Sequence, residues 1–343
     1  MSHRGVRMCV SLVAVVAVVA VAWPAVAQTS PRTPWGDPDL QGIWNNNTLT
    51  PLERPPALAD TEFLTAEAAT AIEREAVARV DRENAPSEVR SEPLPVGGNV
   101  GAYNSYWTEQ GTRIVSTRRT SLVVDPSNGL LPPLSAEGEQ RITSPENRRL
   151  ADVQNGRVPA DGPEQMGLSE RCLWYRGIPS LPTGYNNNYH FLQTPDAVVI
   201  LQEHIHDVRY ILLDGRPHLP DAIRQYAGSS RGRWDGDTLV VETTNLKGAF
   251  IRRWNRPENS LARGTLSETA RVVERFTRIA PDTLDYEFTV DDPGTFTRPW
   301  SGSLPYALAE GPMFEFACHE GNYGMRNMLA GSRAEERAAL EGR

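Results

Sequence analysis

Residues 270–290 contain the pattern that most restricts how this chain can fold. Apolar and polar residues alternate along 284–290, which places one set of side chains on each face of a strand. A second strand-like segment, 270–279, precedes this one, and Pro281 and Asp282 separate the two. The arrangement predicts a β-hairpin with one face in a hydrophobic core.

Further strand-like segments follow one another with Gly and Pro turns, and they show no alternation of strands with helices. They are expected at 112–117, 121–125, 198–203, 208–213, 238–243 and 313–317. The chain is therefore predicted to be mainly β, an antiparallel sheet closed into a lipocalin-like barrel or folded into a sandwich.

The rest of the chain divides by composition. Residues 28–60 are rich in Pro and Asn and lack a regular period, which predicts an extended arm. Residues 61–343 are expected to form one β-rich domain, with helical segments near 65–84 and 135–151 and a short helix at 331–341.

The first 27 residues resemble a secretory signal peptide. Arg4 and Arg7 precede the apolar run 10–23, and Ala25-Val26-Ala27 matches an A-x-A cleavage site. The alternative is an uncleaved membrane anchor, although the run is short for a bilayer span. Cleavage would give a periplasmic or secreted protein without a membrane association of its own.

Net charge narrows the choice of partner. The chain has a formal net charge of −8, and loss of Arg4 and Arg7 with the leader would make it more acidic. Nucleic acids and anionic lipids bind basic surfaces, so neither is expected as a partner. A small molecule is expected instead, and the oligomeric state is left open.

Removal of the leader leaves two cysteines, Cys172 and Cys318. In an oxidising compartment such a pair favours a disulfide, which would close a long segment of chain. The alternative is a catalytic thiol at Cys318, beside His319.

Several runs resemble an uncharacterised family of secreted bacterial proteins. They are WGDPDLQGIW, RTSLVVDPSNG, GRWDGDTLVVETTN, ERFTRIAPDTLDYEFTVDDP and ACHEGNYGMRNMLAG, and the likeness covers residues 35–340. The resemblance implies one exported architecture. It implies no activity, substrate or site residue.

The densest polar cluster lies at 203–209. His206 is the candidate acid or base, Glu203 a residue that orients it, and Arg209 a stabiliser of negative charge. The alternative is a polar hairpin turn whose histidines face water.

A second polar cluster follows Cys318. His319 is the candidate counterpart of His206, and Glu320 is a second orienting residue. Gly321 permits a sharp turn that would direct these side chains and Asn322 toward a barrel mouth. The alternative is a structural turn.

Aromatic side chains are the expected walls of a binding site. Trp234, Trp300, Tyr210 and Tyr323, together with Asn322, are the candidate substrate-binding residues. No cofactor is expected. If a metal is bound, His204, His206 and His319 are its candidate ligands.

These residues favour an exported enzyme of general acid/base chemistry, a hydrolase or lyase acting on a small, partly aromatic or apolar molecule. The first alternative is a β-barrel that carries an apolar ligand without chemistry. The second is a metal enzyme with histidine ligands. Because barrels host all three functions, the fold does not decide between them.

Overall fold

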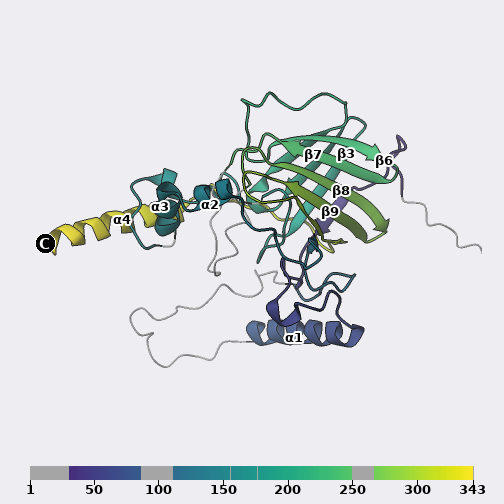
Figure 1. Ribbon diagram of the computed structural model, residues 1–343, viewed down its shortest axis with the longest axis horizontal. Helices are drawn as coiled ribbons and strands as arrows, with labels where there is room; N and C mark the ends of the chain where they lie inside the picture. The colour runs from purple at the N-terminus through teal and green to yellow at the C-terminus, as the bar shows by residue number, and fades with distance from the viewer. Residues whose placement is uncertain (1–30, 86–110, 155, 176, 249–265, 343) are drawn as a thin grey trace, which may run out of the picture.

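The computed structural model describes residues 31–85, 111–154, 156–175, 177–248 and 266–342. The expected signal peptide, residues 1–27, lies outside these ranges. At the centre is a β-barrel (Figure 1). The strands are β1 (Gly42–Asn45), β2 (Val123–Asp125), β3 (Asn188–Thr194), β4 (Ala197–Gln202), β5 (Val208–Leu212), β6 (Ser229–Asp235), β7 (Thr238–Thr244), β8 (Arg271–Ala280), β9 (Thr283–Asp291), β10 (Trp300–Ser303) and β11 (Tyr306–Leu308).

All these strands belong to one sheet, in the order β11-β1-β3-β4-β5-β6-β7-β8-β9-β10-β2. Because β11 pairs with both β1 and β9, nine of the strands close into a barrel. The remaining two, β10 and β2, continue the sheet beyond β9. The predicted barrel is confirmed, and the predicted hairpin forms its longest strand pair, β8–β9.

One pair in the barrel departs from the antiparallel pattern. Strands β5 and β6 run parallel, with Ile211 opposite Ser230. A two-residue turn cannot join parallel strands, so a longer connection, between Leu212 and Ser229, returns the chain from the end of β5 to the start of β6. Trp234, near the end of β6, therefore lies at the barrel end opposite to Val208, where β5 begins.

Side chains fill the interior of the barrel. Trp44, Tyr189, Phe191, Tyr286 and Tyr306 are all fully buried there and belong to one hydrophobic cluster. Their rings contact one another, with Tyr189 and Tyr306 centroids 5.6 Å apart and Tyr286 and Tyr306 centroids 5.1 Å apart. The barrel is thus a packed core.

The helices lie outside the barrel (Figure 1). They are α1 (Ala66–Asn84), α2 (Ala136–Ile142), α3 (Pro145–Gln154) and α4 (Tyr323–Glu341), with 3-10 turns at Pro56–Leu58, Pro163–Gln165 and His204–His206. Among the helices of the described residues, none combines the length and apolar content that crossing a bilayer requires. The predicted helix 65–84 is confirmed, and Thr65 caps it by accepting a hydrogen bond from the Ala68 amide at 3.2 Å.

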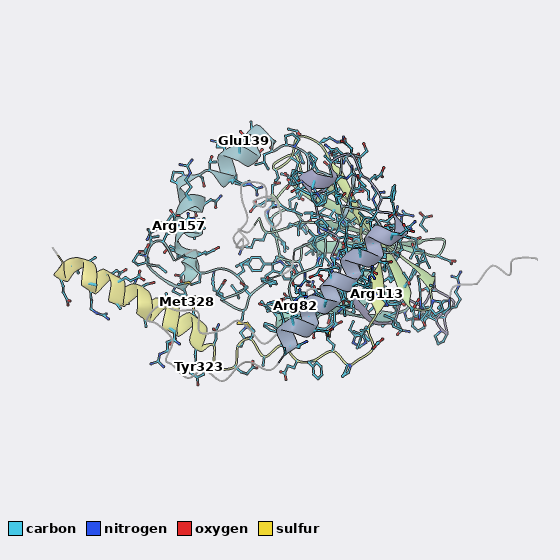
Figure 2. The ribbon with its side chains drawn as sticks, turned by 90° about the horizontal axis from the view of Figure 1, so that it is seen from below. Arg82, Arg113, Glu139, Arg157, Tyr323 and Met328 are labelled. Atoms are coloured by element: carbon cyan, nitrogen blue, oxygen red, sulfur yellow. A yellow bond between two sulfur atoms is a disulfide. The ribbon has the colours of Figure 1, made fainter. Side chains whose placement is uncertain are left out.

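Helices α3 and α4 form a lobe at one side of the barrel, away from α1 (Figure 1). A small hydrophobic cluster of Val153, Ala160 and Met166 packs against Met325 and Leu329 of α4. Figure 2 places Tyr323 at the end of α4 nearest the barrel. The lobe therefore has a small core of its own.

Several predicted elements differ from the structure. The segments 112–117 and 313–317 contain no strand, and the last helix begins at Tyr323 rather than 331. The predicted helix 135–151 is two helices, because a residue before proline avoids helical geometry and Pro145 starts α3. Within the segment expected as an extended arm, 28–60, residues 42–45 form β1, a strand of the barrel.

Candidate functional site

The polar cluster predicted at 203–209 lies at one end of the barrel, where β4 ends and β5 begins. Glu203 is buried, and its Oε2 accepts hydrogen bonds from the Asn188 backbone amide at 3.3 Å and from Asn188 Nδ2 at 2.9 Å. Asn188 is the first residue of β3, so this carboxylate joins the ends of two strands. We call this the Glu203 end of the barrel.

His204 lies within a group of aromatic rings at the Glu203 end. Its ring stacks on Tyr175, with centroids 4.0 Å apart, and on Phe316, with centroids 4.6 Å apart. The ring of Tyr185 also stacks on His204, with centroids 5.2 Å apart, and only 2% of the His204 surface is exposed. We call His204, Tyr175, Tyr185 and Phe316 the aromatic cluster.

The aromatic cluster joins the two polar segments that the sequence predicts to converge. Phe316 comes from the segment before Cys318, and the disulfide between Cys172 and Cys318 fixes that segment to the one carrying Tyr175. The Cα atoms of Cys172 and Cys318 are 5.7 Å apart, although 146 positions separate the two residues in the sequence. The predicted disulfide is confirmed, and a free catalytic thiol at Cys318 is thereby excluded.

The residues directly after Cys318 lie at the surface or at the start of α4. His319 and Glu320 are exposed, and Tyr323 is 71% exposed at the start of α4. Asn322 caps this helix by accepting from the Met325 amide at 3.2 Å, and its Nδ2 donates to the Glu170 carbonyl at 2.8 Å. Asn322 thus has a structural role, as in the turn alternative.

Asp207 is a titratable group at the Glu203 end, and its side chain is partly buried. Burial raises the pKa of its carboxyl from 3.8 to about 7. Its Oδ2 is buried and has no hydrogen-bond partner within the described part of the chain. The backbone carbonyl of Asp207 accepts from the Gln202 amide at 2.8 Å, which fixes the carboxyl beside the start of β5.

The raised pKa predicts how Asp207 affects stability. Between about pH 4 and pH 7 the carboxyl ionises in the unfolded chain but stays protonated in the folded one, so stability falls as pH rises through this window. Asp207→Asn removes the ionisation. Above pH 7 the variant should be more stable than the wild type by on the order of 1–3 kcal/mol, allowing for partial solvent screening.

Urea unfolding at pH 4 and pH 8 measures this effect. The advantage of Asp207→Asn should be present at pH 8 and absent at pH 4. Asp221 is exposed, and Asp221→Asn is the matched control, with no expected change at either pH. An equal effect of Asp207→Asn at both pH values would contradict the assignment.

Arg209 is separate from Glu203 and Asp207 at the Glu203 end, because its side chain lies inside the barrel. It forms an ion pair with Glu274 of β8, and the two side chains are 3% and 0% exposed. Nε donates to Ser230 Oγ at 2.9 Å and Nη2 to Thr243 Oγ1 at 2.7 Å. Its charge is neutralised within the core, so it is not placed to stabilise charge on a substrate.

The four predicted aromatic walls are scattered. Trp234 lies at the barrel end opposite to the Glu203 end. Trp300 packs in the core against Phe288, with ring centroids 5.4 Å apart. Tyr210 points outward from β5, with 65% of its surface exposed, because neighbours along a strand face opposite sides. With Tyr323 exposed on α4, the structure does not bring these four together.

A metal at His204, His206 and His319 finds no support in the described side chains. Within them, no three His, Cys, Asp or Glu residues are grouped closely enough to hold an ion. The side chain of His206 lies outside the described part of the structure.

A serine, a histidine and a glutamate also meet on the outer face of the barrel. His218 Nδ1 lies 3.3 Å from Ser229 Oγ, and Nε2 lies 3.2 Å from Glu242 Oε1. A serine nucleophile with its base has this composition. However, Ser229 is only 4% exposed and its Oγ also accepts from the Leu219 amide at 3.3 Å. The arrangement therefore anchors the connection before β6.

Sequence reasoning found Glu203 and the disulfide but did not assign roles to Asp207, Tyr175, Tyr185 or Phe316. The identity of Asp207 was visible in the sequence, whereas its desolvation depends on tertiary packing. The rings belong to irregular segments without a period. No protein-family model, curated protein or solved structure matches this chain.

Proposed function

We propose that the protein is an exported hydrolase or lyase that uses general acid/base chemistry at the Glu203 end of the barrel. Asp207 is the proton-transfer group, and the substrate is a small, partly aromatic molecule. The observation that carries the proposal is the half-buried Asp207 carboxyl, which has a pKa of about 7 and follows His204 of the aromatic cluster by three residues. The leader-like residues 1–27 and the disulfide support export.

The role of Asp207 follows from its pKa. A group with a pKa near the working pH is present in both protonation states, so it can accept a proton in one step and return it in another. An ordinary aspartate, with a pKa near 3.8, is almost fully ionised at neutral pH and is a poor proton donor. Burial of the Asp207 carboxyl raises its pKa above that of an ordinary aspartate.

The class of substrate follows from the surface around the aromatic cluster. Tyr185 is 38% exposed, and Phe314, in the same segment as Phe316, is 73% exposed. Exposed rings offer faces and edges against which an aromatic substrate can stack. Glu203 is held by Asn188 and supports the strand ends rather than exchanging protons with substrate.

The carrier alternative is weaker, because a lipocalin-like carrier holds its ligand within the barrel. Here the interior contains packed rings and the Arg209–Glu274 pair. A ligand inside would have to displace both. We therefore place the substrate outside the strands, at the Glu203 end.

The test is hydrolysis of a panel of p-nitrophenyl esters and glycosides by the mature protein and its Asp207→Asn variant. We expect turnover by the wild type with an apparent pKa near 7. The variant should lose about 10²–10⁴-fold in kcat/KM, the usual contribution of a general acid or base. The absence of turnover across the panel would contradict the hydrolase assignment.

Two matched variants show whether the loss of activity is specific to Asp207. Asp285→Asn makes the same change at another carboxyl whose pKa is raised by burial and by Glu287, near the opposite end of the barrel. Ser229→Ala removes the hydroxyl beside His218. Both variants should retain wild-type kcat/KM. Loss of activity in Ser229→Ala with activity retained in Asp207→Asn would move the site to the outer face.

A further inference from the structure

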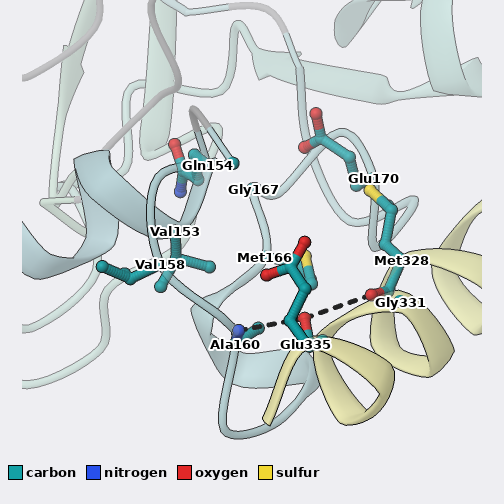
Figure 3. Close-up of a pocket in the computed structure, with 12 residues that line it drawn as sticks. Val153, Gln154, Val158, Ala160, Met166, Gly167, Glu170, Met328, Gly331 and Glu335 are labelled. Carbon is teal, nitrogen blue, oxygen red and sulfur yellow. Dashed lines mark hydrogen bonds between the residues drawn. The ribbon is translucent and has the colours of Figure 1, made fainter. Parts of the chain in front are cut away.

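The lobe formed by α3 and α4 contains a pocket of about 410 Å³ (Figure 3). Its lining comes from the end of α3, the segment 156–170 and one face of α4. The volume lies within the range of sites that hold small molecules. The pocket shares no lining residue with the Glu203 end, so it is a separate feature.

The walls of the pocket are largely apolar and adaptable. Val153 and Val158 line one side, and Met166 and Met328 contribute thioether side chains (Figure 3). Methionine has three flexible bonds and a polarizable sulfur, which lets it adjust to ligands of different shape. This part of the pocket fits an alkyl chain or a small ring.

Two carboxylates accompany these apolar walls. Glu170 and Glu335 line the pocket from different segments (Figure 3). Glu335, on α4, takes part in no ion pair with any residue that the structure describes, whereas the next acidic residue, Glu336, pairs with Arg333 at 2.7 Å. The pocket therefore presents negative charge beside apolar surface.

Two arginines of the lobe pair with acidic side chains outside the pocket lining. Arg157 pairs with Asp152 at 3.1 Å, and Arg149 pairs with Asp161 at 2.7 Å. A bound cation would complement the Glu335 carboxylate, while a bound anion would be repelled.

We propose that this pocket binds a small organic ammonium ion with an apolar body. The ammonium group lies against Glu335, and the apolar body packs on Met166, Met328 and the two valines. A carboxylate beside an apolar wall selects against fatty acids, which carry the opposite charge, and against alcohols of the same length, which lack charge.

The probe is hexylammonium, titrated calorimetrically into the full mature chain, with hexanoate and hexanol as matched compounds. We expect saturable 1:1 binding of hexylammonium and weaker binding of the other two. Glu335→Gln should weaken hexylammonium binding about fivefold, the scale of an exposed ion pair, and should remove the preference over hexanol.

A second variant fills the pocket without disturbing the fold. Gly331 lines the pocket on α4, and a Cβ at this position would meet no atom within 4 Å. Gly331→Phe should therefore fold, since replacing an interior helical glycine also raises helix propensity. It should abolish hexylammonium binding, and circular dichroism checks that the helix is intact.

Glu341→Gln, at the C-terminal end of α4 and outside the pocket lining, is the control and should bind as the wild type does. Asp207→Asn should also bind normally, so failure of this proposal and failure of the enzymatic one give different results. Absence of saturable binding, binding that survives Gly331→Phe, or equal binding of hexanoate would each overturn the inference.

Discussion

Replacement of Arg209 by methionine is expected to lower the free energy of unfolding by about 3–5 kcal/mol. The change leaves the Glu274 carboxylate inside the barrel without its cationic partner. Glu274 would still accept a hydrogen bond from the Tyr286 hydroxyl at 2.8 Å, but a neutral donor does not compensate a buried charge.

The surroundings of this pair show why both members are needed. Burial alone would lower the pKa of Arg209, and Glu274 reverses that effect so that the pKa is raised. Burial and the charge of Glu274 also raise the pKa of Tyr286 well above 10, which keeps its hydroxyl protonated as a donor. The Ser180 amide donates to the same hydroxyl at 3.1 Å, so the network reaches a loop outside the strands.

Urea unfolding of the single variants Arg209→Met and Glu274→Gln and of the double variant measures the coupling. The double variant should be more stable than Arg209→Met, because it has no uncompensated charge. Equal stability of Arg209→Met and the double variant would contradict an uncompensated charge as the cause.

Removal of the disulfide by the double change Cys172→Ser and Cys318→Ser is expected to cost about 2–5 kcal/mol of stability. The bond joins residues 146 apart, so its loss frees a long segment of the unfolded chain. It also releases the segment carrying Phe316 from the segment carrying Tyr175. The aromatic cluster should therefore loosen as well as the fold.

Thermal unfolding with and without dithiothreitol measures this effect. Reductant should lower the Tm of the wild type to that of the double serine variant. It should leave the variant's own Tm unchanged, which controls for side effects of the reagent. A wild type that is insensitive to complete reduction, confirmed by mass spectrometry, would contradict a stabilising role.

The regular strands could be predicted because alternation is a local signal. The pattern at 284–290 marks β9, and the apolar runs before and after 204–207 mark β4 and β5. Strand β1 has four residues within a Pro-rich and Asn-rich region, and its pairing with distant β3 and β11 is not encoded locally. The segment 313–317 has strand-like composition, but Phe316 packs on His204 instead of joining the sheet.

The candidate site, like the strands, could be predicted only as far as local sequence determines it. The order of residues 203–209 identifies a polar turn, but it does not say that Arg209 faces inward to a glutamate 65 positions away. The order of these residues also does not show that Asp207 is desolvated by burial or that His204 is enclosed by aromatic rings. Desolvation and ring packing depend on distant segments, so chemistry could be suspected from sequence while its placement could not.

Closure of the barrel has a consequence for how molecules of this protein meet one another. An exposed strand edge invites pairing with another chain and leads to aggregation. Closing nine strands leaves the described sheet to continue only through β10 to β2. Strand β2 has three residues, Pro126 follows it, and its Asp125 pairs with Arg298 at 2.6 Å. A short edge followed by proline offers a poor template, which disfavours edge-to-edge association at high local concentration.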